Sequence, residues 1–256
     1  MNRRSSLLVP LLALATLLAA CGSGSSKSSN APTTRTITVF AAASLTKAFT
    51  AEGKAFEASH PGLHVTFSFA GSPTLVAQII QGAPASVLAT ADVSSIDQVK
   101  DKLSAAPVVF AHNQLAIVTA KGNPLKITTL AGLAKPGLKV VLAGPTVPVG
   151  KAAAKALKVA HVTVTPVSLE DAVTGVVTKV RLGEADAGIA YVTDLVGSTV
   201  GSAVGSGVGG VPLPGTTTSL AIGAIKGSNN PHDADAFIGY VQSVEGRKIL
   251  TSYGFT

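Results

Sequence analysis

The sequence predicts an α/β protein in which mostly parallel strands are flanked by helices. Strand-like and helix-like segments alternate from about residue 36 onward, a rhythm that is typical of βαβ units. Hydrophobic residues make up 46% of the 256 residues but aromatic residues only 4%, so the predicted core consists mainly of Ala, Val and Leu. In folds of this class, ligands bind beyond the carboxyl ends of the strands, where helix N-termini meet.

Short apolar segments and segments with helical spacing follow one another along the chain. The predicted strands are residues 36–43, 64–70, 86–91, 114–120, 139–144, 187–192 and 219–226. The predicted helices are residues 45–59, a stripe at 75–80, a segment beginning at Ile96, and residues 151–157, 173–182 and 233–250. The Gly-rich stretch 197–215 predicts a loop or a weak strand.

Residues 1–20 predict a secretory signal peptide. Two arginines precede an apolar run at 7–20, which is too short to span a bilayer comfortably. The run ends in "LAAC", which resembles a bacterial lipobox, where the protein is cut before the cysteine and the thiol is lipidated. The Ser- and Gly-rich residues 21–35 have the composition of a flexible tether. We therefore expect a lipoprotein anchored through Cys21 to the outer face of the cell membrane; an ordinary signal peptide and a spare thiol is the alternative.

Charge and cysteine content exclude several classes of protein. The net charge of +7 falls to +5 once Arg3 and Arg4 leave with the signal peptide. The basic residues are scattered and aromatic residues are few, so we expect no nucleic-acid partner. A positive charge favours an anionic partner through electrostatic steering, although solubility explains it equally well. Cys21 is the single cysteine, which excludes a disulfide or a thiolate metal site within one chain.

Two motifs resemble a serine–lysine acylation motif and a phosphate-binding loop, but each is incomplete. Ser44 and Lys47 have the spacing of serine acyl hydrolases, which also need an S-D-N-like element and a K-[ST]-G strand; neither is present. The segment "GPTVPVGKA" (144–152) is similar to a phosphate-binding loop. However, five residues separate its glycines where the motif needs four, and Ala152 replaces the magnesium-binding Ser or Thr.

Three predicted helices have no acid in the first turn: Ser44 and Ser72 directly precede the first two, and Pro148 begins the third. A helix N-terminus offers unpaired N–H groups and partial positive charge, which favour an anion. For one serine alone, N-capping is the simplest role. Two such serines could instead donate their hydroxyls and N–H groups to one oxyanion.

Several segments together resemble the periplasmic molybdate-binding proteins of ABC transporters. They are "ITVFAAASLTKAF", "FAGSPTLVAQIIQGAPASVLATAD", "TVPVGKAAAKAL", "GEADAGIAYVTD" and "NPHDADAFIGYVQSVEGRKILTSYGF". The resemblance runs from about residue 37 to residue 255. It implies a monomeric binding protein, not an enzyme and without a cofactor, that delivers molybdate and tungstate to a membrane permease.

The resemblance also implies two lobes that close on the anion. Lobe one would comprise residues 36–113 and 219–256, and lobe two residues 114–218. The chain would cross between the lobes near 112–114 and near 218–220. The family's tyrosine-proline at the second crossing is replaced by Ser219, so we expect local remodelling there.

By the same resemblance, neutral groups hold the oxyanion, and the metal is bound only in that form. The implied ligands are the hydroxyl and N–H of Ser44 and Ser72, the N–H of Val149 and Val173, and the hydroxyl of Tyr191. The family usually has Asn or Asp where this chain has Ala172. The register of the donor at Ala172 or Val173 therefore stays open.

The donor set favours some anions over others. A fully deprotonated dianion needs only donors, whereas hydrogen phosphate also needs an acceptor, and none of the implied ligands is a carboxylate. We therefore expect molybdate or tungstate. Sulfate or another oxyanion is the alternative within this class, and a Ser44/Lys47 acyl hydrolase is the alternative from another class.

Overall fold

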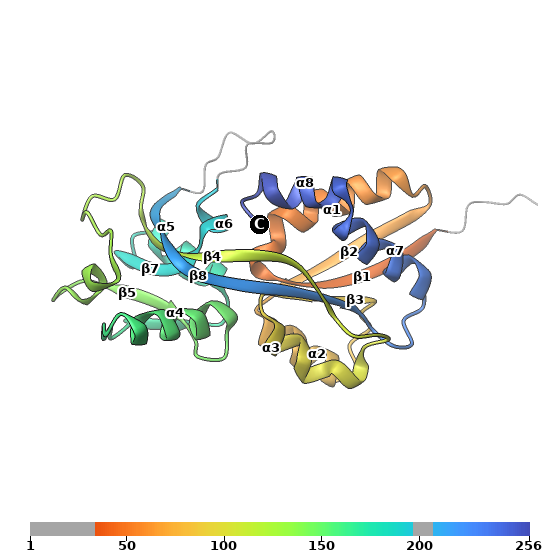
Figure 1. Ribbon diagram of the computed structural model, residues 1–256, viewed down its shortest axis with the longest axis horizontal. Coiled ribbons are helices and arrows are strands. Elements are labelled where there is room, and N and C mark those ends of the chain that lie inside the picture. Colours follow the sequence, from red (N-terminus) through yellow and green to blue (C-terminus); the bar gives the residue numbers. More distant parts are fainter. Residues whose placement is uncertain (1–33, 197–206) are drawn as a thin grey trace, which may run out of the picture. The chain divides into compact units, whose positions relative to one another are not determined.

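The computed structural model describes residues 34–196 and 207–256. Within them one mixed sheet of eight strands has the order β2-β1-β3-β8-β4-β7-β5-β6 (Figure 1). The predicted signal peptide, Cys21, most of the predicted tether and residues 197–206 of the Gly-rich stretch lie outside these ranges. The α/β class with a mixed sheet and flanking helices is confirmed.

The elements alternate along the chain much as the sequence predicts. The strands are β1 Arg35–Ala42, β2 Leu63–Ala70, β3 Val87–Thr90, β4 Val108–Ala120, β5 Val140–Ala143, β6 Ser168–Glu170, β7 Ala187–Tyr191 and β8 Val208–Ala224. The α-helices are α1 Thr46–Ser59, α2 Ser72–Ile80, α3 Val93–Ile96, α4 Pro148–Val159, α5 Val173–Arg181, α6 Val192–Leu195, α7 Pro231–Gln242 and α8 Val244–Ser252. Short 3-10 turns are η1 Ala43–Leu45, η2 Asp97–Lys102 and η3 Leu130–Ala134.

Two long antiparallel strands, β4 and β8, run side by side through the middle of the sheet (Figure 1). On one side β1 pairs in parallel with β2 and β3, and on the other β5 pairs in parallel with β6 and β7. The pairs β3–β8, β8–β4 and β4–β7 are antiparallel. The sheet is therefore less uniformly parallel than predicted, because its two central strands run against their neighbours.

Both central strands extend beyond their predicted bounds. β4 begins at Val108 rather than at residue 114, and β8 begins at Val208 rather than at residue 219. Residues 208–215 contain several glycines and prolines, which weaken a strand on their own. Their pairing with β4, from Thr119–Gly209 to Ala116–Pro212, holds them extended. Of the two interpretations of 197–215, the strand is correct for this described part.

The predicted helix 233–250 is two helices that meet at Ser243. The Ser243 hydroxyl accepts the N–H of Gly246 at 3.1 Å and so caps α8. Serine is among the residues preferred at this position. The apolar periodicity continues across the break, so the pattern alone did not reveal it.

The buried core is divided along β4 and β8. One hydrophobic cluster lies entirely between Leu115 and Leu213. Two others are built from residues before Phe110–Ala111 and after Leu220, and they cover opposite faces of β1, β3 and β8. Helices α1, α7 and α8 pack on one of those faces, while α2 and α3 pack on the other. The polar segment between the clusters pairs His112 with Ser219 and Asn113 with Thr218.

One acid, Glu52 of α1, is fully buried against the core. Its exposed fraction is 0%, and neither carboxyl oxygen has a hydrogen-bond partner among the described residues. Burial raises the pKa of Glu52 from 4.5 to about 9, because the interior disfavours the charged form. The folded protein therefore holds this proton at neutral pH, whereas the unfolded chain releases it.

This difference predicts that stability falls as the pH rises from about 4.5 to about 9, because in that window the native state binds one more proton than the unfolded state. The Glu52→Gln variant cannot titrate there. Relative to it, the wild type should lose up to about 1.4 kcal/mol of unfolding free energy per pH unit. Urea unfolding of both proteins near the two ends of the window measures the difference; parallel pH profiles would contradict the burial of a neutral Glu52.

Candidate functional site

The residues implied as anion ligands all line one small cavity: Ser44, Ser72, Val149, Val173 and Tyr191. Each lies at or shortly after the carboxyl end of a strand, namely β1, β2, β5, β6 and β7 in that order. The first two strands are parallel to each other, and so are the last three. The cavity therefore lies where strand ends and helix N-termini meet, as expected for an α/β fold.

Ser44 lies in the 3-10 turn η1, which joins β1 to α1. The residue ahead of the turn is Ala42, and no side chain caps it. The interpretation of Ser44 as a helix cap is therefore wrong, because the turn begins at Ala43, two residues before the predicted start of the helix at residue 45. The Ser44 Oγ is buried and has no hydrogen-bond partner among the described residues, so its hydroxyl is free to donate into the cavity.

Ser72 is the first residue of α2, and the cap residue is Gly71, which has no side chain to cap with. The prediction that Ser72 lies just before the helix is thus also wrong by one residue. Ser72 is 1% exposed, and its Oγ accepts the N–H of Ala91 at 3.1 Å. Because that bond uses a lone pair of the oxygen, the hydroxyl hydrogen stays available for a ligand.

Val149 and Val173 would contribute backbone N–H groups rather than side chains to the site. Val149 is the second residue of α4 and Val173 the first residue of α5, and both are buried. The first N–H groups of a helix have no partner within it, and neither first turn contains an acid. Of the two registers that the sequence leaves open, Val173 lines the cavity while Ala172 is the cap residue of α5.

Tyr191 ends β7 and is 1% exposed. Its hydroxyl has no partner within hydrogen-bonding geometry among the described residues. Burial raises the pKa of Tyr191 well above its ordinary value, and the nearby Thr218 hydroxyl opposes this only in part. The backbone N–H of Tyr191 donates to the Asp194 carboxylate at 2.9 Å, which fixes the turn into α6. The phenol is thus a neutral donor at the cavity.

No charged residue is among those described as lining the cavity. Two lysines start the helices next to it, but their amines are engaged elsewhere. Lys47 Nζ donates to the Val196 carbonyl at 3.2 Å, and Lys151 Nζ forms an ion pair with Asp92 at 2.5 Å. Lys47 is therefore not positioned as a base for Ser44, which argues against a serine–lysine hydrolase.

The cavity wall also contains residues that were not predicted as ligands: Ala42, Ala43, Gly71, Ala91, Val147 and Pro148. The signal for Gly71 was its place directly before Ser72. The signal for Ala91 was that it follows β3, whose carboxyl end lies at the same edge of the sheet as β1. Gly71 and Ala91 could both have been placed at the cavity if the strand order had been known, but the sequence alone does not determine that order.

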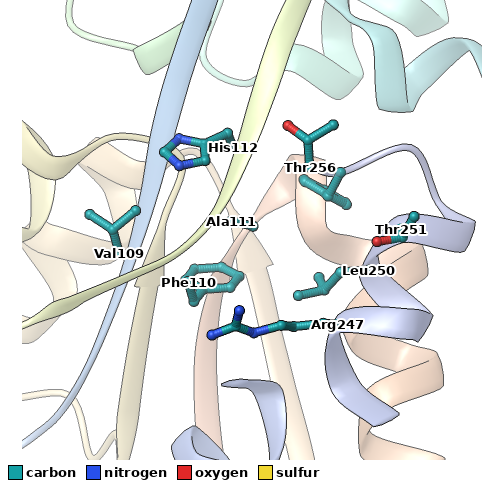
Figure 2. A pocket seen from close by; sticks show the side chains of 9 residues that line it. Val109, Phe110, Ala111, His112, Arg247, Leu250, Thr251 and Thr256 are labelled. Carbon is teal, nitrogen blue, oxygen red and sulfur yellow. The ribbon is translucent and has the colours of Figure 1, made fainter. Parts of the chain in front are cut away.

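A larger pocket of about 260 Å³ lies beside β4 and α8 and contains none of the predicted ligands (Figure 2). Phe110 and Leu250 line it with apolar surface. The backbone N–H and carbonyl of His112 both pair with Thr256, and Arg247 Nε donates to the Gln242 carbonyl. These groups are therefore already paired, and the pocket contains none of the donors that the resemblance implies for an oxyanion.

The comparisons with known proteins agree with the resemblance. The chain matches the family of bacterial extracellular solute-binding proteins over residues 37–256. It is 42% identical over 243 residues to the molybdate-binding protein ModA of Mycobacterium tuberculosis, spanning 93% of this chain and 92% of that relative.

Solved structures show the same fold at lower identity. The periplasmic molybdate-binding protein of Azotobacter vinelandii aligns with a TM-score of 0.70 and 17% identity, over 86% of this chain and 98% of that one. The sulfate-binding protein SubI of Mycobacterium tuberculosis aligns with a TM-score of 0.75 and 20% identity, over 86% of each chain. These two similarities establish the fold. The ligand has to be inferred from the residues of the site.

The burial of Tyr191 predicts that its phenol stays protonated where free tyrosine, with a pKa of about 10, ionises. In an alkaline absorbance titration, the Tyr191→Phe variant should release as much tyrosinate as the wild type until the wild type unfolds. A smaller signal from the variant below that pH would show that Tyr191 ionises in the folded protein and is not enclosed.

Proposed function

Because this chain belongs to the bacterial extracellular solute-binding proteins, we propose that it captures molybdate or tungstate and delivers it to an ABC permease in the membrane. The observation that carries the proposal is a cavity that gathers neutral hydrogen-bond donors from several strand ends and has no charged residue in its described lining. Such a site binds its ligand and releases it unchanged; the protein is a binding protein and not an enzyme.

The free hydroxyls and helix N-termini make the cavity suitable for an oxyanion. Helices α1, α2, α4 and α5 have no acid in their first turns, so nothing there competes with an anion for the N–H groups. Ser44, Ser72 and Tyr191 add hydroxyls, which we infer are the side-chain ligands. Hydrogen bonds to a charged group contribute about 1.5–3 kcal/mol each, so several of them support tight binding without a cationic side chain.

The same donor set distinguishes between oxyanions. Binding hydrogen phosphate requires a group that accepts a hydrogen bond from its P–OH, such as a carboxylate. No carboxylate is among the described lining residues. Molybdate and tungstate are fully deprotonated and larger than sulfate. The fold shared with a sulfate-binding protein keeps sulfate as the alternative, but its shorter bonds to oxygen would leave donors in this set out of reach.

We infer that the donors come from two lobes that close on the anion. The proposed lobe one comprises residues 36–113 and 219–256, and lobe two residues 114–218. The separation of the hydrophobic clusters at Ala111/Leu115 on β4 and at Leu213/Leu220 on β8 supports this division. Two serines would then come from lobe one, while the two valines and Tyr191 come from lobe two. One chain contains all five, so a monomer suffices.

Replacing a serine hydroxyl should weaken binding without unfolding the protein. We expect Ser44→Ala and Ser72→Ala each to raise the molybdate dissociation constant roughly ten- to hundredfold, the loss of one hydrogen bond to a charged group. Isothermal titration calorimetry measures it. Ser59→Ala, at the exposed end of α1, is the matched control and should bind like the wild type. Unchanged affinity in both cavity variants would remove these serines from the site.

We further propose that residues 1–20 are a signal peptide and that Cys21 carries a lipid anchor, with a tether from residue 22 to the start of β1 at Arg35. The family acts outside the cytoplasm, and no helix among the described residues is long and apolar enough to cross a membrane. A lipid on Cys21 would keep the protein beside its permease.

The anchor can be tested in cells that express the full chain. Wild-type protein should fractionate with membranes and take up a labelled fatty acid, because a lipidated cysteine inserts its chains into the bilayer. Cys21→Ser should lose the label and appear in the soluble extracytoplasmic fraction. Equal membrane association of both proteins, or no label on the wild type, would contradict lipidation.

A further inference from the structure

Gly71 marks a very close approach between the two proposed lobes. It lies before Ser72 at the start of α2, and its backbone angles, φ −59 and ψ 140, are open to any residue. A Cβ placed on Gly71 would nevertheless fall within 3.0 Å of the Asp171 carbonyl oxygen, and 3.7 Å from Ala172 Cβ. Asp171 and Ala172 lead into α5, which belongs to the other lobe. Glycine is required here by the neighbouring lobe and not by the local conformation.

A second contact between the lobes lies on the α4 side of the cavity. Lys151, two residues after Val149, reaches from α4 to Asp92, 2.5 Å away, and to Ser94 Oγ, 2.8 Å away. The Asp92 carboxylate also accepts the Ser95 N–H at 2.9 Å and so caps α3. The pair is partly buried, with side-chain exposures of 33% and 19%. It therefore joins the helix of one proposed donor to the loop that follows β3 in the other lobe.

Asp92 is also electrostatically close to the anion site. It follows Ala91, which lines the cavity, and its charge contributes to the raised pKa of Tyr191. Burial works to raise the pKa of Asp92, but the hydrogen bonds from Lys151 and Ser95 outweigh it and hold that pKa below its ordinary value. Asp92 is thus a carboxylate whose negative charge would repel a dianion. Lys151 offsets that charge from outside the cavity.

Lys47 makes a similar but more exposed contact from lobe one. It lies in the first turn of α1, three residues after Ser44, and donates to Val196 O across the lobes. On each side, then, a lysine within three residues of a proposed anion donor reaches the opposite lobe.

From these contacts we infer that Gly71 and the Lys151–Asp92 pair are positioning residues that set oxyanion affinity by permitting and holding the closed arrangement of the lobes. This inference rests on the proposed function. Neither contact requires the anion itself, and neither provides it with a donor. Both exist only when the two lobes are together, so their loss should act on release of the anion more than on its capture.

Gly71→Ala tests the closest contact. The added methyl leaves every proposed donor in place, and in an open arrangement it meets no opposite lobe. We expect the thermal midpoint without anion to be unchanged and the molybdate dissociation constant to rise about tenfold or more, the equivalent of about 1.4 kcal/mol. Stopped-flow kinetics should assign most of that change to faster dissociation. Gly239→Ala on α7, where a Cβ meets nothing within 4 Å, is the matched control and should bind like the wild type.

The ion pair is tested by rescue. Lys151→Met should speed molybdate release, and Lys151→Arg should restore most of the wild-type rate because it keeps the charge. Adding Asp92→Asn to Lys151→Met should recover part of the affinity, since it removes the uncompensated carboxylate while asparagine still caps α3. A purely structural role for Lys151 would give equal affinity for the single and the double variant.

The outcomes separate this inference from the function it rests on. If the wild type binds no oxyanion in the calorimeter, the proposed function fails. If the wild type binds molybdate but Gly71→Ala releases it at the same rate, only the closure role is overturned. A fall in the anion-free thermal midpoint of Gly71→Ala that matches its loss of affinity also overturns it, because the clash would then exist without closure.

Discussion

The proposed site depends on a single electrostatic constraint: an anion has to be held where water is excluded, by groups that carry no full charge. Partial charge at helix N-termini and free hydroxyls meet this constraint. It explains why α1, α2, α4 and α5 have no acid in their first turns and why Lys47 and Lys151 are paired away from the cavity. It also explains the buried hydroxyls of Ser44 and Tyr191, which have no hydrogen-bond partner within the described part of the chain and would otherwise cost free energy.

The sheet topology brings these donors together from distant parts of the sequence. β1, β2 and β3 end on one side of the cavity, and β5, β6 and β7 end on the other, with β4 and β8 continuous between them. Because the proposed donors come from both proposed lobes, we infer that affinity depends on how the lobes meet. The backbone approach at Gly71 and the Lys151–Asp92 pair are therefore part of the binding energetics, although neither residue is proposed as a ligand.

Local sequence patterns predicted most helices and strands. They did not predict features that depend on interactions between distant segments of the chain. The apolar strand at 36–43 and the helix at 45–59 follow from periodicity, and β1 and α1 differ from them by one residue or the short turn η1. The Gly- and Pro-rich start of β8 was ambiguous because its extended form comes from pairing with β4. At the site, helix starts without acids indicated Ser44, Ser72 and the helix that begins at Pro148, whereas Val149, Val173 and Tyr191 came as ligands from the family resemblance alone. The closeness of Gly71 to Asp171 requires the folded coordinates.

The central claim is that a cavity of neutral donors, without an acceptor carboxylate, selects a fully deprotonated oxyanion. The most direct test is a calorimetric titration of the purified protein with molybdate, tungstate, sulfate and phosphate under one buffer condition near neutral pH. The account predicts tight and similar binding of molybdate and tungstate, weaker binding of sulfate, and no competition from hydrogen phosphate. Hydrogen phosphate binding as tightly as molybdate would contradict it.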